Sequence, residues 1–127
     1  METEVTNYNG PNGLPYCNFG VMCRVQRNVR DPGGYYNFWV ACDGEHQISK
    51  WLPDGGAIWL SDAKEASNPI RAGESARVVA ECIGPQLIFW INDVLVAEAY
   101  DTQFKQGDVG FSTGWWWAVD YFRVYKP

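Results

Sequence analysis

Residues 76–101, ARVVAECIGPQLIFWINDVLVAEAYD, decide the fold class of this chain. Three runs rich in β-branched and aromatic residues, 76–84, 87–91 and 94–101, follow one another with only two residues between neighbouring runs. Such runs, bounded by turn-forming residues, predict strands, in which successive side chains point to opposite faces. The Asn92-Asp93 step tolerates positive φ and therefore predicts a two-residue hairpin loop.

The same pattern continues on both sides of that stretch. Segments rich in Gly, Pro, Asn and Asp, with RDPGG and PDGG as the clearest examples, separate further short apolar runs. Additional strands are predicted at 3–8, 17–26, 35–44, 46–52, 57–60, 108–113 and 116–125, and residues 61–73 are predicted to form a polar loop. About nine or ten strands at this spacing are typical of an all-β sandwich or barrel.

Length and composition indicate one folded domain. The chain has 127 residues, and we expect a single β-sandwich domain over residues 1–127 that belongs to a larger extracellular protein. Its formal net charge is −5 and its Lys and Arg residues are scattered, which argues against nucleic-acid binding. Polar residues interrupt every apolar run, so no membrane insertion is expected. The N-terminal residues do not resemble a signal peptide, so an export signal would have to lie upstream.

The four cysteines are Cys17, Cys23, Cys42 and Cys82. They form no Cys-x-x-Cys pair, and His46 is the single histidine, so a structural zinc site is poorly supported. Two disulfides formed in an oxidising compartment are the preferred interpretation, and four buried thiols are the alternative. Four cysteines allow three pairings, and the spacing does not choose among them.

Seven tryptophans raise the question of which indoles pack in the core and which remain outside it. In the run 35–44, alternation places Tyr36, Phe38 and Val40 on one face and Trp39 on the other. In the run 87–91, Trp90 likewise lies opposite the residues on either side of it. Packing is the ordinary explanation for such indoles, because tryptophan is mostly buried in proteins. Strands that are apolar on both faces are otherwise associated with an aromatic surface.

Four pieces of the sequence, in order, carry a resemblance to a known family. They are FGVMCRVQ at 19–26, YYNFWVACDG at 35–44, RVVAECIGPQLIFWINDVLVAEAYDTQFKQGDVGF at 77–111 and VDYFRVY at 119–125. Together they resemble bacterial concanavalin A-like lectin/glucanase sandwich domains of the laminin-G-like, DUF1080-related type. The third piece is the most specific, because its motifs match in order and spacing over about thirty-five residues.

The resemblance implies a two-sheet antiparallel jelly-roll sandwich. It also implies a disulfide between Cys23 and Cys82, which match two recurrent cysteines of the family, and this leaves Cys17 for Cys42 across the hairpin of the second and third strands. Such domains normally have strands before residues 3–8, including the one that pairs with the C-terminal strand. We therefore expect this chain to lack N-terminal strands and to present an open edge for strand addition or self-association.

Calcium is the one cofactor that the resemblance suggests. Sandwich lectins of this shape often hold Ca²⁺ with Asp, Asn and backbone oxygens, which are the ligands that a hard cation requires. Asp120 matches an aspartate of the family and is the first candidate ligand, with Asp101 and Asn92 after it. The alternative is that these are ordinary turn and strand-end residues.

Catalytic motifs are not evident in the sequence. Glucanases with this sandwich carry a Glu-x-Asp-x-x-Glu strand motif, and retaining hydrolysis needs two carboxyl groups about 5–5.5 Å apart. Glu81 and Glu98 each stand alone, and His46, which has no recognisable orienting partner, is interpreted as a surface histidine. We expect no enzymatic activity, and a glycoside hydrolase-like reaction is the weakest alternative.

The first functional interpretation is a non-catalytic, lectin-like module that binds a glycan or polysaccharide. Sugar rings stack on aromatic rings, and the indole adds a polar N–H at its edge. Trp39 and Trp90 are the leading candidates, because both point away from the core on what we expect to be one sheet. The predicted ligand-binding residues are Trp39, Trp90, Trp116, Trp117, Tyr36 and Trp51.

The alternative is a structural or assembly module of a surface or filament protein. Aromatic residues are enriched at the centres of protein interfaces, and a partial sandwich must cover its core with something. In that case the partner is a second copy of the chain or the remainder of a parent protein. Both interpretations place the protein outside the cell or on its surface.

Overall fold

The computed structural model describes residues 1–7, 18–26, 33–41, 45–61, 64–65, 74–113 and 117–125. This part of the chain contains eleven strands and no helix, and hence no helix that could cross a membrane. The strands are β1 (Glu2–Asn7), β2 (Asn18–Val25), β3 (Tyr35–Ala41), β4 (Glu45–Trp51), β5 (Ala57–Trp59), β6 (Lys64–Glu65), β7 (Ser75–Ile83), β8 (Gln86–Ile91), β9 (Val94–Tyr100), β10 (Asp108–Thr113) and β11 (Trp117–Arg123).

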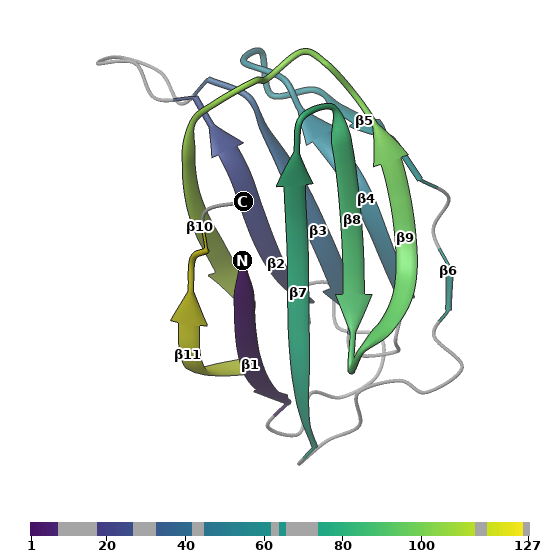
Figure 1. The fold of residues 1–127 in the computed structure, drawn as a ribbon, viewed down its shortest axis with the longest axis vertical. Helices are drawn as coiled ribbons and strands as arrows, with labels where there is room; N and C mark the ends of the chain where they lie inside the picture. Colours follow the sequence, from purple (N-terminus) through teal and green to yellow (C-terminus); the bar gives the residue numbers. More distant parts are fainter. Residues whose placement is uncertain are drawn as a thin grey trace.

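The strands form two antiparallel sheets that lie face to face (Figure 1). Sheet A, in front in that view, has five strands in the order β11-β1-β7-β8-β9. Sheet B, behind it, has six strands in the order β10-β2-β3-β4-β5, with β6 paired to β4. The predicted all-β, two-sheet antiparallel sandwich is confirmed, and β6 adds a short strand to the segment predicted as a loop.

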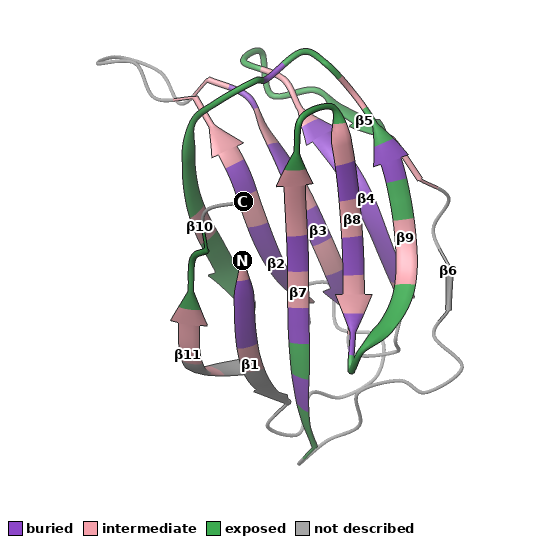
Figure 2. Cartoon of the chain, in the orientation of Figure 1, coloured by how far each residue is buried: buried purple, intermediate pink, exposed green. Residues whose placement is uncertain are grey.

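Alternation along the strands builds the core between the two sheets. Every second residue of β3 and β8 is buried, and Figure 2 shows this as alternating bands along the ribbons. The ring of Phe38 in sheet B meets that of Phe89 in sheet A edge-on, with ring centroids 5.6 Å apart. Aromatic packing of this kind joins the layers and adds to the free energy of burial. The largest fully buried side chains are Tyr36, Phe19, Phe38, Phe89, Ile48, Leu87, Val21, Val40, Val78 and Thr3.

The hairpin between β8 and β9 forms as the sequence predicts. Asn92 and Asp93 have φ values of 50° and 64°, which are the left-handed conformations that a two-residue turn requires. The side-chain oxygen of Asn92 also accepts a hydrogen bond from the backbone N–H of Arg77 at 2.9 Å. The loop is therefore tied to β7 as well as to its own strands.

A disulfide joins Cys23 in β2 to Cys82 in β7 and so connects sheet B with sheet A. The two Cα atoms are 6.8 Å apart, and the cysteines are 59 residues apart in the sequence. The pairing implied by the family resemblance is confirmed. Cys17 and Cys42 lie outside the described residues, so their pairing stays a prediction.

The expectation that the partner of the C-terminal strand is missing is wrong. β1 pairs with β11 on one side and with β7 on the other, both antiparallel. The short N-terminal strand itself therefore occupies the position that the resemblance assigned to an upstream strand. Among the described strands, β11 and β9 form the edges of sheet A.

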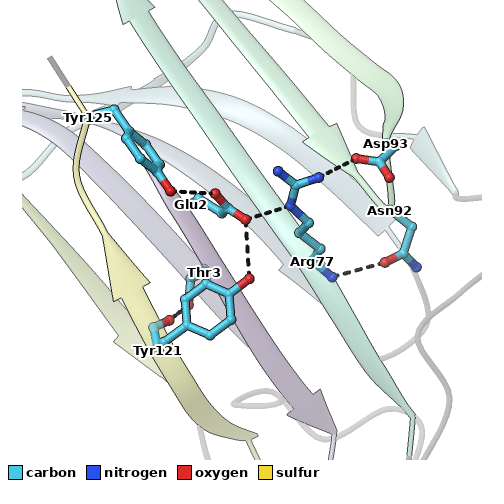
Figure 3. Close-up of polar contacts among 7 residues, drawn as sticks. All are labelled: Glu2, Thr3, Arg77, Asn92, Asp93, Tyr121 and Tyr125. Carbon is cyan, nitrogen blue, oxygen red and sulfur yellow. Dashed lines mark hydrogen bonds and ion pairs between the residues drawn. The ribbon is translucent and has the colours of Figure 1, made fainter.

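Hydrogen bonds to one carboxylate hold β1 between its neighbours (Figure 3). Glu2 accepts hydrogen bonds from the Arg77 guanidinium at 2.6 Å and from the hydroxyls of Tyr121 and Tyr125 at 3.2 and 3.1 Å. Arg77 belongs to β7 and Tyr121 to β11, so the contacts span three strands. The bond from Arg77, assisted by the two hydroxyls and opposed by burial, holds the pKa of Glu2 below its ordinary value.

Replacing Cys23 and Cys82 together by alanine should lower the free energy of unfolding by about 2–4 kcal/mol, because the bond restricts the unfolded chain. Urea unfolding followed by tryptophan fluorescence measures the change, and the paired replacement leaves neither of these thiols free to mispair. A double variant as stable as the parent would contradict the structural role of this disulfide.

Glu2 should make stability depend on pH. Because its pKa is lowered, its charged form stabilises the fold above the ordinary glutamate pKa of about 4.3, and the contribution is lost as the pH falls through the folded-state value. Glu2→Gln should therefore be less stable than the parent at neutral pH, and the difference should shrink on acidification. Thermal unfolding followed by circular dichroism across the acid range tests this, with the exposed Glu98→Gln as control. A difference independent of pH would contradict it.

Candidate functional site

The two leading candidates for ligand binding do not share a sheet. Trp39 lies on β3 in sheet B, whereas Trp90 lies on β8 in sheet A. Both alternate with buried residues and are half-buried on the outer faces of their sheets. The prediction that they form one surface is therefore wrong, because consecutive hairpins place β2–β4 in one layer and β7–β9 in the other.

Tyr36 is a core residue and not a ligand-binding one. Its side chain is 0% exposed, and its hydroxyl donates a hydrogen bond to Asp101 at 2.6 Å and accepts one from the Phe104 N–H at 3.1 Å. Burial, together with the hydrogen bond to Asp101, raises the pKa of Tyr36 to about 12. Alternation along the sequence places Tyr36 on the same face as Phe38, and this pattern correctly indicates that Tyr36 is buried.

The tryptophans near the C-terminus remain untested as ligand contacts. Trp116 lies outside the described residues. Trp117 begins β11, and only its backbone is described. Their predicted roles stay predictions.

A hollow of about 420 Å³ lies over the outer face of sheet B. This volume falls within the range of small-molecule sites in proteins. Two of the predicted residues, Trp39 and Trp51, contribute to it, and Trp59, which was not predicted as a ligand contact, joins them. The residues that line the hollow are Asn37, Trp39, Glu45, Gln47, Ser49, Trp51 and Trp59.

Strand pairing places polar residues at the centre of this hollow. Asn37 on β3 lies opposite Ser49 on β4, and Ser49 in turn lies opposite Trp59 on β5. Gln47 and Ser49 face outward from the sheet and are nevertheless only 8% and 1% exposed. Since β4 lies between β3 and β5, the side chains of its neighbours cover them. The hollow therefore has a polar floor.

Indoles surround that floor. Trp39 lies opposite Gln47, two residues along the strands from the pair Asn37 and Ser49. Trp51 lies two residues from Ser49 along β4 in the other direction. Trp51 stacks on Tyr35 with ring centroids 6.1 Å apart and an interplanar angle of 14°, which fixes the plane of its indole. Trp59, the last residue of β5, is 62% exposed. Three large apolar rings thus flank neutral hydrogen-bonding groups.

The basic residues of β4 point away from the hollow and into the interior. Lys50 forms an ion pair of 2.7 Å with Asp101, and both side chains are mostly buried. His46 is 4% exposed, and its Nε2 lies 3.2 Å from the Val96 carbonyl oxygen. The interpretation of His46 as a surface histidine is therefore wrong. Among the described residues that line the hollow, Glu45 is the one with an ionisable side chain.

The structure does not bring Asn92 and Asp101, two of the three predicted calcium ligands, together. Asn92 and Asp101 lie at opposite ends of β9, and the Asn92 side-chain oxygen is bonded to Arg77 (Figure 3). Burial alone would raise the pKa of Asp101, but hydrogen bonds from Lys50 and Tyr36 outweigh it and the pKa is lowered. These contacts of Asp101 with Lys50 and Tyr36 stabilise the fold. Asp101 and Asn92 are therefore not placed to bind one ion together.

Asp120 stays a predicted calcium ligand. It belongs to β11, and its side chain is not among those that the structure describes. The described residues contain no group of three or more His, Cys, Asp or Glu side chains that could hold a metal ion.

Comparison with known proteins identifies similar folds. No family model matches the chain, and no curated protein matches it in sequence. The carbohydrate-binding module CBM66 from Bacillus subtilis has a similar structure, with a TM-score of 0.68 and 20% identity over 87% of this chain and 63% of that chain. Sheep galectin-11 in complex with glycerol is similar with a TM-score of 0.56 and 14% identity, over 93% of this chain and 86% of that chain.

At these identities the comparisons show the fold alone. The β-sandwich predicted from the sequence is that of lectin-like and carbohydrate-binding proteins, while the laminin-G-like, DUF1080-related assignment stays a prediction. The chain spans 63% of the length of the CBM66 structure.

Asp101→Asn should lower the free energy of unfolding by about 3 kcal/mol, because it leaves the mostly buried Lys50 without a charged partner. Asp93→Asn is the matched control: Asp93 pairs with Arg77 in the open, and such pairs contribute about 0–1 kcal/mol. Urea unfolding of both variants measures the difference. Equal losses in the two variants would contradict the structural role assigned to Asp101.

Proposed function

We propose that this chain is a non-catalytic carbohydrate-binding module and that the hollow on sheet B holds the glycan. The observation that carries the proposal is the arrangement of Trp39, Trp51 and Trp59 around the polar floor of Asn37 and Ser49. Sugar rings present apolar C–H faces and polar hydroxyls, and this surface offers both matching features. Indoles supply a large contact area, and amide and hydroxyl groups fix orientation.

The folds of the similar proteins support the proposal. One is a carbohydrate-binding module and the other is a galectin in complex with glycerol, a small polyol. A shared fold does not define a site, so the residues of the hollow itself are the stronger support.

The same residues support a non-catalytic role. Hydrolysis of a glycosidic bond ordinarily requires two carboxyl groups, and Glu45 is the one carboxylate among the described lining residues. The disulfide between Cys23 and Cys82 fits an oxidising compartment, which supports a secreted or cell-surface location.

Assembly is the second candidate function, and the edge of sheet A favours it. Val94, Leu95 and Tyr100 on the edge strand β9 are 61%, 44% and 68% exposed. An apolar edge strand can pair with another chain. Light scattering over a range of protein concentrations tests this: dimers that disappear in Leu95→Lys would support it, and a monomer throughout would contradict it.

Trp39→Ala and Trp59→Ala should each weaken glycan binding by about tenfold or more, because each removes a stacking surface worth about 1.4 kcal/mol or more. Trp90→Phe, on the outer face of the opposite sheet, is the matched control and should leave the affinity unchanged. A glycan array identifies a ligand, and isothermal titration calorimetry measures the affinities. If Trp90→Phe weakens binding while Trp39→Ala and Trp59→Ala do not, the glycan site lies elsewhere.

A further inference from the structure

A second hollow lies at one end of the sandwich. The strands β2, β7 and β9 all finish at this end (Figure 1). The hollow, which we call the end hollow, has a volume of about 270 Å³. Its described lining residues are Arg24, Gly84, Pro85, Asp101, Thr102 and Lys105. None of these residues lines the hollow on sheet B, so the two are separate surfaces.

Arg24 reaches the end hollow because the backbone of β2 is irregular at this point. Cys23 bonds to sheet A, so in a regular strand Arg24 would point to the outer face of sheet B. The pairing of β2 with β10 shifts register between Asp108 and Gly110, and Arg24 has a left-handed φ of 52°. Bulges re-aim side chains, and a positive φ is uncommon in a residue other than glycine. The guanidinium accordingly contacts the turn between β7 and β8 of sheet A.

One nitrogen of the Arg24 guanidinium fixes its position, and the other two are left for a ligand. Nη1 donates hydrogen bonds to the carbonyl oxygens of Gly84 at 2.6 Å and Phe104 at 3.0 Å. Nε and Nη2 donate to no described residue. Their N–H groups form a planar fork that matches two oxygens of a carboxylate or sulfate. Because the guanidinium is already held, binding would cost little side-chain entropy.

The charges around the end hollow favour an anion. Arg24 and Lys105 are positive, and neither forms an ion pair with a described residue. The carboxylate of Asp101 is already matched, because one oxygen pairs with Lys50 at 2.7 Å and the other accepts from the Tyr36 hydroxyl at 2.6 Å. Two positive charges therefore remain available to a negatively charged group.

The size of the end hollow indicates an organic ligand. A water molecule takes up about 30 Å³ in the liquid, so a hollow of about 270 Å³ has room for more than an inorganic ion. Pro85 adds an apolar ring to the lining, and Thr102 adds a residue with both a methyl and a hydroxyl group. Small-molecule sites commonly combine apolar groups with a few polar ones in this way.

We propose that the end hollow binds a small organic anion through a carboxylate or sulfate group. In this arrangement the free fork of Arg24 holds the oxygens of that group, and Lys105 adds a second positive charge. The inference goes beyond the proposed function and does not depend on it, because the glycan is assigned to the opposite set of residues on sheet B.

Nuclear magnetic resonance of the backbone amides tests the site and the charge requirement. The probes are glucuronate and glucose 6-sulfate, with glucose as the uncharged counterpart of both and inorganic sulfate as the bare ion. Both organic anions should shift the amide signals of Arg24, Gly84, Thr102 and Lys105, and glucose should not. Inorganic sulfate should bind more weakly than either. Added sodium chloride should weaken binding of the anions, because salt screens the interaction.

Variants test the roles of the two cations. Lys105→Gln should weaken glucuronate binding by about threefold, as expected for an exposed charge, and Arg24→Lys, which keeps the charge but loses the fork, by about tenfold. Arg123→Gln is the matched control, because it removes one exposed positive charge from β11 and should leave the affinity unchanged. Circular dichroism checks that Arg24→Lys, which also loses two hydrogen bonds, is folded. Lys105→Gln tests the proposal even if Arg24→Lys is not.

Several results would overturn the inference and leave glycan binding on sheet B untouched. The first is that neither organic anion shifts the signals of the end hollow, or that glucose shifts them equally. The second is that inorganic sulfate binds as tightly as glucuronate. The third is that Arg123→Gln weakens binding as much as Lys105→Gln, which would indicate attraction to overall charge and not to this site.

Discussion

Burial of one face of every strand against the opposite sheet is the constraint on which the rest of this structure depends. The period of two along β3 and β4 sends Phe38, Val40 and Ile48 into the core. The same period turns Asn37 and Ser49 outward, opposite each other across the strands. The packing of the core therefore determines which side chains reach the outer face of the sheet. The packing that holds the sheets together also sets the positions of the polar floor and of the indoles that surround it.

The sequence shows which face of a strand is buried more clearly than it shows which of the two sheets the strand joins. Alternation correctly separated Trp39 and Trp90 from the core, and Asn92-Asp93 correctly predicted a hairpin. Local pattern carries no information on which sheet a strand joins, so Trp39 and Trp90 were assigned to one surface although they lie on opposite ones. The disulfide came from the family resemblance and not from spacing. Trp59 was missed because its short strand shows too few residues to reveal which face is outward.

The candidate site illustrates why a shared sandwich says little about a ligand. The core residues must pack, whereas the outward residues of β3, β4 and β5 are free to vary with the ligand. Identities of 20% and 14% to the similar structures are consistent with a common framework that carries different outer faces. In this chain the interior takes up the basic groups of β4, and the described lining of the hollow consists of amide, hydroxyl and indole groups together with the carboxylate of Glu45. The indole, amide and hydroxyl groups of that lining are the feature on which the proposed glycan site rests.

Nuclear magnetic resonance of the indole N–H groups tests the central claim most directly. In a protein labelled with ¹⁵N at tryptophan, each indole gives its own signal, which single Trp-to-Phe replacements assign. On titration with an oligosaccharide that the protein binds, the account predicts shifts for Trp39, Trp51 and Trp59, with the signal of Trp90 unchanged. A shift of Trp90 while the three sheet B signals stay fixed would place the ligand on the opposite face of the sandwich and contradict the account.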